Sequence, residues 1–286
     1  MKNSIGLAIF SALIFFSYTT VSAIDSASII ISPVTVIQGE PILIAVSNAD
    51  ASEVQKISFD TVSLGIFTYQ NKPTAIVGID LYKKPGTYPV LVTLADGQIL
   101  ETKVIVGTRE KIEAPLGIPE KLGGNTPASQ TKLVTSLAAE NKSLVKLRTG
   151  TKSFWKEAFR FPLKEITITD DYGYSRTTGA YSIAHKGTDF RAKEGTAIKA
   201  INRGVVRVAK EYRNYGKTVV VDHGLGLTSL YMHLSKIKVN VGELVLPGQV
   251  IGLSGKTGYA TSPHLHLSVR LNDISIDPLK FFELFK

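Results

Sequence analysis

The chain has 286 residues, no cysteine and a formal net charge of +9 at pH 7. Its length suits two modest domains, and the lack of cysteine excludes disulfides, thiolate metal sites, a cysteine nucleophile and a lipidated cysteine. The positive charge would draw the protein toward anionic surfaces such as wall polymers or phospholipid head groups. The lysines are scattered without the arginine and aromatic pattern of nucleic-acid binding, so we expect no nucleic-acid partner.

Residues 1–23 have the features of a secretory signal peptide. Lys2 precedes an apolar run from Ile5 to Phe16, which is too short to span a bilayer comfortably. Val21-Ser22-Ala23 then supplies the small residues of a cleavage site. We therefore expect cleavage near Ala23 and a periplasmic or secreted protein associated with the cell envelope. An uncleaved anchor is the alternative, but no later stretch reaches transmembrane length, so the mature chain is expected to have no transmembrane segment.

Residues 24–107 contain about seven short apolar stretches that are separated by turn signals such as Lys84-Pro85-Gly86 and Ala95-Asp96-Gly97. This spacing predicts an immunoglobulin-like β-sandwich. The region has no histidine, and we interpret it as a spacer, inhibitory or wall-binding domain. The expected strands cover residues 27–31, 42–46, 56–59, 61–69, 74–81, 88–92 and 99–106.

Residues 108–150 are predicted to form a linker followed by a helix from about 127 to 148. Pro127 suits the first helical position, Thr126 can cap it, and Gly150 can end it. One stripe of this helix is apolar, which favours packing on a neighbouring domain over binding to a partner protein. The stripe consists of Leu133, Leu137, Leu144 and Leu147.

Residues 151–286 are rich in glycine and predict an antiparallel β domain with few helices. The overall fold class is thus mostly β, with an N-terminal immunoglobulin-like sandwich, a linker helix and this C-terminal domain. Period-two alternation on the strand expected at 227–234 places His233 on the face opposite Leu230 and Met232. The expected strands cover residues 197–208, 217–222, 227–234, 248–253 and 264–271.

All five histidines lie in this C-terminal half. His264 and His266 are two residues apart, so they share one face of a strand. His185 and Asp189 flank Gly187, whose backbone freedom would allow their side chains to converge. Two imidazoles and one carboxylate are the ligand set of an open, catalytic zinc site.

The histidines outside the ligand set need separate interpretations. Either His264 or His266 would be the third ligand, and a base could come from the other member of this pair or from His233. Any one of these histidines alone is more often an ordinary surface or strand residue, but the set favours a metal site. His223, between a strand and a turn, is interpreted as structural.

Three motifs in order resemble those of the lysostaphin-type (LytM) zinc endopeptidases, over about residues 151–286. They are His185-Lys186-Gly187-Thr188-Asp189, Tyr231-x-His233-Leu234 and His264-Leu265-His266, with flanks that include Asp277-Pro278-Leu279. One departure is Ser262, where the family often has glycine.

The resemblance implies a LytM-type peptidase domain at 151–286, with His185, Asp189 and His266 holding one Zn²⁺ per chain. His264 and His233 would be the catalytic pair of a metalloendopeptidase that hydrolyses peptide bonds in peptidoglycan stem peptides or cross-bridges, in cell-wall remodelling. Three residues just before His185 are candidates for oxyanion or substrate contacts. They are Tyr174, Arg176 and Tyr181.

Two other hypotheses come from different classes. The chain could be a non-catalytic wall-binding protein or an activator of other wall hydrolases, although the presence of every ligand and both catalytic histidines argues against this. Residues 241–252 could be a lipoyl- or biotin-carrier hairpin, but the nearest lysine, Lys256, lies outside the repeat. The sequence does not predict which peptide bond is cut or what the oligomeric state is.

Overall fold

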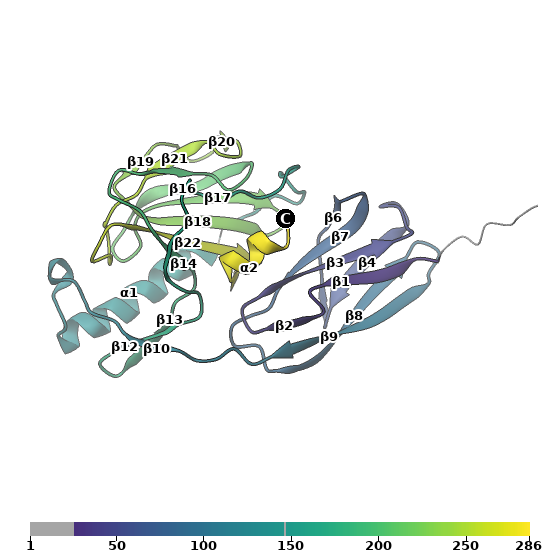
Figure 1. The fold of residues 1–286 in the computed structure, drawn as a ribbon, viewed down its shortest axis with the longest axis horizontal. Helices are drawn as coiled ribbons and strands as arrows, with labels where there is room; N and C mark the ends of the chain where they lie inside the picture. The colour runs from purple at the N-terminus through teal and green to yellow at the C-terminus, as the bar shows by residue number, and fades with distance from the viewer. Residues whose placement is uncertain (1–25, 146) are drawn as a thin grey trace, which may run out of the picture.

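The computed structural model describes residues 26–145 and 147–286, so the predicted signal peptide lies outside the described residues. The fold is mostly β, as predicted, with the N-terminal strands on one side of the molecule and the C-terminal domain on the other (Figure 1). Within the described ranges, no helix has both the length and the apolar character needed to cross a membrane.

The N-terminal part consists of two β-sheets that face each other. Alternate residues such as Ile42, Ile44 and Val92 are fully buried between them, in a core separate from that of the C-terminal domain. One sheet has the order β1 (Ser28–Ser32), β3 (Pro41–Ser47), β7 (Lys72–Gly78) and β6 (Ile66–Tyr69). The other has the order β2 (Thr35–Ile37), β9 (Ile99–Gly107), β8 (Gly86–Leu94), β4 (Val54–Phe59) and β5 (Val62–Ser63).

The single strand predicted over 61–69 was wrong. Its residues form β5 and β6, which belong to opposite sheets. A sandwich requires the chain to cross between its layers, and a continuous run of β-forming residues does not mark where that crossing falls.

The two halves of the chain share an apolar interface. Phe67 packs edge-to-face on Trp155 with 5.0 Å between the ring centroids, and Tyr69 packs similarly on Phe285 at 5.3 Å. Arg109 in the linker joins the halves as well, because its Nη2 lies 3.1 Å from Asp277 Oδ2 while its Nε donates to the Gln38 carbonyl oxygen.

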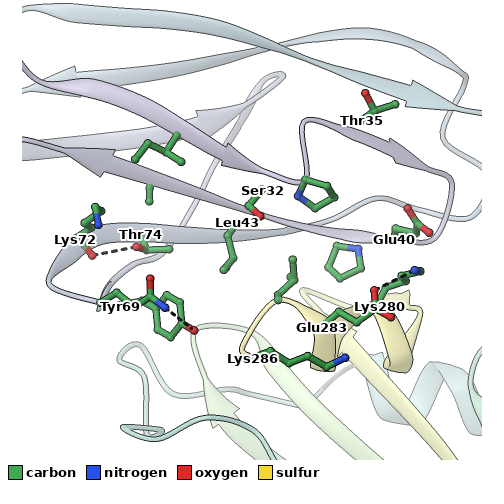
Figure 2. A pocket seen from close by; sticks show the side chains of 16 residues that line it. Ser32, Thr35, Glu40, Leu43, Tyr69, Lys72, Thr74, Lys280, Glu283 and Lys286 are labelled. Carbon is green, nitrogen blue, oxygen red and sulfur yellow. Dashed lines mark hydrogen bonds and ion pairs between the residues drawn. The ribbon is translucent and has the colours of Figure 1, made fainter.

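A cavity of about 620 Å³ lies at this junction, between the outer face of the sheet that contains β1 and the C-terminal helix (Figure 2). Its wall carries both signs of charge, including Lys72, Glu40 and Lys280. No group of metal-ligating side chains among the described residues lies there.

The C-terminal domain is built on one large antiparallel sheet. Its order is β11 (Ile168–Asp170), β14 (Thr188–Arg191), β22 (His264–Leu271), β18 (Leu227–Leu234), β17 (Gly216–Gly224), β16 (Gly204–Tyr212) and β20 (Leu244–Val245), with β23 (Ile274–Ile276) paired to β22. Two small sheets flank it. One contains β10 (Glu113–Pro115), β12 (Ser175–Thr178) and β13 (Tyr181–Ala184), and the other β15 (Ala197–Lys199), β21 (Val250–Leu253) and β19 (Lys236–Ile237).

The strand predicted over 197–208 was also wrong, because it is split into β15 and β16 in different sheets. The chain turns between them, where the Ile201 N–H donates to the Tyr231 hydroxyl and the Asn202 side chain donates to the Glu157 carbonyl oxygen. Side-chain partners therefore satisfy the backbone and fix the turn.

The linker contributes more structure than predicted, including the short helix η1 (Glu120–Leu122) and β10. Helix α1 (Pro127–Val145) begins where expected, and Thr126 Oγ1 accepts from the Ser129 N–H. It ends before the predicted position 148. Leu144 is buried against residues of the large sheet, so α1 packs on one face of the C-terminal domain (Figure 1). The last helix, α2 (Pro278–Glu283), is capped by the Asp277 carboxylate.

Candidate metal centre

The three predicted ligands meet where β14 lies beside β22. Asp189 and His266 are direct partners in the antiparallel register, and His185 precedes β14 by three residues. His266 Nδ1 lies 2.7 Å from Asp189 Oδ1. His185 Nε2 lies 3.2 Å from the same oxygen and 3.0 Å from His266 Nδ1. Ligand atoms of these three residues thus form one cluster.

Hydrogen bonds on the far side of each ring fix the tautomers. His185 Nδ1 lies 2.7 Å from the Asp171 carbonyl oxygen, which can only accept. His266 Nε2 lies 3.0 Å from Ser268 Oγ, and this hydroxyl donates to the Lys186 carbonyl oxygen. Both far-side nitrogens are therefore protonated in the neutral rings. His185 Nε2 and His266 Nδ1 consequently point bare lone pairs at each other.

The Asp189 carboxylate completes this acceptor-only group. Burial opposes its ionisation, but the adjacent His185 and His266 imidazoles hold its pKa well below the usual range. Its other oxygen, Oδ2, accepts from Arg176 Nη2 at 2.9 Å, which leaves Oδ1 to face the two imidazoles. Burial also lowers the pKa of His266 to about 4, against the effect of Asp189. The imidazole and carboxylate are thus both in the forms that bind metal.

The donor set fits a zinc ion. Two bare nitrogens and a carboxylate oxygen within 3.2 Å of one another repel unless a cation or proton lies between them. Their separations are slightly below the roughly 3.3 Å expected of neighbouring ligands in tetrahedral zinc coordination. The partners behind the rings resemble those that orient histidine ligands in zinc sites. Three protein ligands leave the fourth position open.

Gly187 is needed here for a reason other than the predicted one. Its φ is not among the positive values that favour glycine, so the expectation based on backbone freedom was wrong. A Cβ at this position would instead overlap the His266 ring and lie 2.6 Å from the Leu267 carbonyl oxygen. The absence of a side chain therefore gives the His266 imidazole the space that it occupies.

Substituting Gly187→Ala is expected to weaken zinc binding by about 10–100-fold, the range seen when the orientation of a ligand is disturbed. The added methyl group must displace His266. Competition with a chromogenic chelator measures the affinity. Gly117→Ala is the matched control, since a Cβ there meets nothing within 4 Å. Equal zinc affinities for the two variants would contradict this explanation.

His233 and His264 lie beside the cluster. Their ring centroids are 4.9 Å apart, and His264 Nε2 is 3.8 Å from Asp189 Oδ1. His233 Nδ1 lies 2.9 Å from the Thr257 carbonyl oxygen, and His264 Nδ1 lies 2.9 Å from that of Ser262. Each neutral ring therefore keeps Nε2 unprotonated. Burial, together with His264 and His266, lowers the pKa of His233 to about 3.

Alternation along β18 is as predicted up to Met232, but the face predicted for His233 was wrong, because His233 lines the same cavity as Met232. Met232 and Leu230 lie on the face covered by α1, and Tyr231 is in the main core. Regular alternation would place His233 with Tyr231. Its φ of 62° breaks that alternation, and its N–H donates to the Tyr215 carbonyl oxygen. A left-handed residue at the end of the strand thus turns the imidazole toward the metal ligands, an example of backbone strain at a candidate functional site.

The remaining predicted residues occupy different positions. Arg176 contacts Asp189 and lines the same cavity as the three histidines His185, His233 and His266. The Tyr181 hydroxyl lies 3.1 Å from Thr131 Oγ1 on α1, and the Tyr174 hydroxyl bonds to Asp171. Neither tyrosine lines the cavity.

His223 lies apart from the cluster, in agreement with its interpretation as structural. Its ring is fully buried and bonded to the Arg203 carbonyl oxygen and the Ser229 hydroxyl. Burial lowers its pKa to about 4.

The sequence analysis missed several residues around the ligands. The cavity beside them measures about 290 Å³, and one of its walls is α1, with Leu133, Leu137 and Asn141. Ser268 and Arg270 follow His264 and His266 at intervals of two along β22 and line the same cavity. The alternation that paired the two histidines would have identified both residues.

The fold and the cluster define a mostly β protein with a two-histidine, one-carboxylate candidate metal centre. Comparison with known proteins shows a match within the C-terminal domain: residues 183–278 match the model of peptidase family M23.

Two curated relatives and one solved structure illustrate the similarity. Peptidoglycan DD-endopeptidase ShyA of Vibrio cholerae is 41% identical over 96 residues, which cover 34% of this chain and 22% of the relative. Lysostaphin of Staphylococcus staphylolyticus is 39% identical over 124 residues, which cover 39% of this chain and 25% of the relative. The chain therefore spans only about a quarter of the length of these two relatives.

The similarity to a solved structure extends beyond the matched domain. A crystal structure of a putative peptidase M23 from Pseudomonas aeruginosa aligns with a TM-score of 0.64 and 27% identity. The alignment covers 87% of this chain and 96% of the other. Strands of the N-terminal half therefore take part in it as well as the peptidase domain.

Proposed function

We propose that this protein is an exported zinc endopeptidase that hydrolyses peptide bonds of peptidoglycan. The observation that carries the proposal is the convergence of His185 Nε2, Asp189 Oδ1 and His266 Nδ1 into one cluster, beside the imidazoles of His233 and His264. The activity of one relative, the peptidoglycan DD-endopeptidase ShyA, supports a peptidoglycan substrate. The complete ligand set favours an enzyme over the non-catalytic activator.

The three donor atoms would hold Zn²⁺, which supplies a Lewis acid for the scissile carbonyl group and lowers the pKa of a bound water. Arg176 holds Asp189 in place through Oδ2, so that Oδ1 remains available. Ser268 and the Asp171 carbonyl oxygen hold the two imidazoles in the ligand tautomers. These partners contribute by orienting the ligand side chains, which must be aligned before the substrate binds.

His233 and His264 move the protons. Each has its Nδ1 beside a backbone carbonyl oxygen, so in the neutral ring each presents the lone pair of Nε2. One accepts the proton of the attacking water at its Nε2 as general base. That proton then passes to the leaving amine, either from this ring or through the second ring once its own Nε2 is protonated, as general acid. Their similar hydrogen bonds fit either division of these roles.

Incubation of purified peptidoglycan with the zinc-loaded protein tests the proposal. We expect the release of soluble peptide-containing fragments, its loss after treatment with 1,10-phenanthroline, and its return when ZnCl₂ is added. Analysis of the fragments by mass spectrometry would identify the bond that is cut. If protein with one zinc per chain releases nothing, the hydrolase proposal fails and the activator becomes the better account.

A further inference from the structure

Arg270 lies on the same face of β22 as the candidate metal ligand His266. The intervening residues Leu267 and Val269 point into the main core on the other face. Arg270 lines the cavity that also contains His185, His233 and His266. The candidate metal centre and this guanidinium are therefore parts of one continuous cavity, with Ser268 between them.

The side chain of Arg270 is largely buried, and no carboxylate of the described residues pairs with it. Arg270 is only 5% exposed, and its buried Nε has no hydrogen-bond partner in the described part of the chain. No carboxylate oxygen of the described residues lies within ion-pair distance of it, whereas Arg109, Arg176 and Arg207 all have such a partner. Burial lowers its pKa, and the nearby Tyr215 and Asp273 only oppose that effect.

A buried charge without a partner is costly, because the solvation lost on burial is not replaced. Arginine on a protein surface usually covers apolar groups with its stem and keeps its head in water. Here the head is buried as well, in a cavity that is open beside the ligands. An anion that binds in the cavity would satisfy the guanidinium with charge-assisted, two-pronged hydrogen bonds.

The position along the strand indicates which anion fits. Arg270 is four residues from His266, so their Cα atoms are about 13 Å apart at 3.3 Å per strand residue. An extended peptide has nearly the same rise per residue. A carboxylate about four residues from the scissile bond would therefore reach Arg270. The apolar side chains of Leu137 and Met232 line the same cavity as His266 and Arg270.

We propose that Arg270 is a specificity-determining residue that binds a free carboxylate of the peptide substrate. The proposal rests on the proposed function of the metal centre. It predicts that a cross-linked peptide with this carboxylate free is cleaved about 10–100-fold more efficiently than the same peptide with the group amidated, the range expected of hydrogen bonds to a charged group. The carboxylate can be the terminal one or one on a side chain. Peptides amidated only at the terminus, or only at the side chain, distinguish these two sources.

The test measures kcat and KM of the full zinc-loaded protein on the acid and amide forms of one peptide. Arg270→Met should lose the preference for the acid through a higher KM, with similar kcat and unchanged zinc content. Arg270→Lys should restore part of the preference for the acid, because lysine keeps the positive charge but cannot form the two parallel hydrogen bonds of a guanidinium. Circular dichroism and zinc content verify that both variants fold.

Three results would overturn the assignment. They are equal cleavage of both peptides by the wild type, an unchanged preference in Arg270→Met, and a loss in that variant that is equal for acid and amide. The first result does not depend on any variant folding. If the wild type cleaves neither peptide, the proposed function fails instead, and calorimetric titration of the wild type with the two peptides decides the carboxylate site: tighter binding of the acid supports it, and equal binding overturns it.

Discussion

Replacing His266 with alanine is expected to remove zinc from the protein and to reduce peptidoglycan hydrolysis by more than about 10³-fold. The substitution deletes one of the three proposed ligands in the described part of the chain, and loss of the metal would remove both the Lewis acid and the acidified water. Zinc content by mass spectrometry and the release of soluble fragments measure the two effects. Added zinc should raise the Tm of the wild type but not that of the variant, because a ligand stabilises only the state that binds it.

His264→Ala is the matched control for this experiment. It removes an imidazole from the same strand face, two residues away, but not a member of the ligand cluster. We expect this variant to retain one zinc per chain. If His264→Ala loses zinc while His266→Ala keeps it, the assignment of ligand and catalytic histidine is reversed.

The second large effect concerns the catalytic pair. His233→Ala and His264→Ala are each expected to lower kcat/KM by about 10²–10⁴-fold, the usual contribution of a general acid or base. Because the two rings would act on the same proton transfers, the double variant should lose far less than the product of the single effects. Steady-state kinetics on a defined cross-linked peptide, at equal zinc content, measures these values.

Thr261→Ala provides the comparison for nonspecific effects on the loop before β22. Thr261 is exposed and lies three residues before His264. The substitution Thr261→Ala should leave kcat/KM within about twofold of the wild-type value, as expected for an exposed residue outside the ligand cluster. Activity of His233→Ala close to that of Thr261→Ala would remove His233 from the mechanism.

The ligand cluster could be anticipated because it depends on local patterns. Two histidines at i and i+2 share a strand face in any β-sheet, and β22 spans 264–271 as expected. Nothing in the sequence pattern showed that β14 would lie beside β22 with Asp189 opposite His266. The resemblance to a known family supplied only the identity of the three ligands, and the pairing of the two strands is a finding of the structure.

Other features could not be anticipated because they depend on tertiary context. The left-handed backbone at His233 moves its imidazole to the face opposite the predicted one, and this conformation is uncommon for a non-glycine residue, so alternation alone does not predict it. Gly187 is required by the His266 ring that packs against it, which no neighbour in the sequence reveals. The role of α1 as a wall of the cavity depends on where the helix docks.

Digestion of an isolated cross-linked peptide dimer in H₂¹⁸O by the zinc-loaded protein tests directly whether the protein is a zinc-dependent peptide hydrolase. We expect monomers that carry one ¹⁸O atom in the newly formed carboxylate, together with a new free amine, and no product from His266→Ala. Dimers left intact by protein with one zinc per chain would rule out the proposed function, and so would products that form equally with His266→Ala.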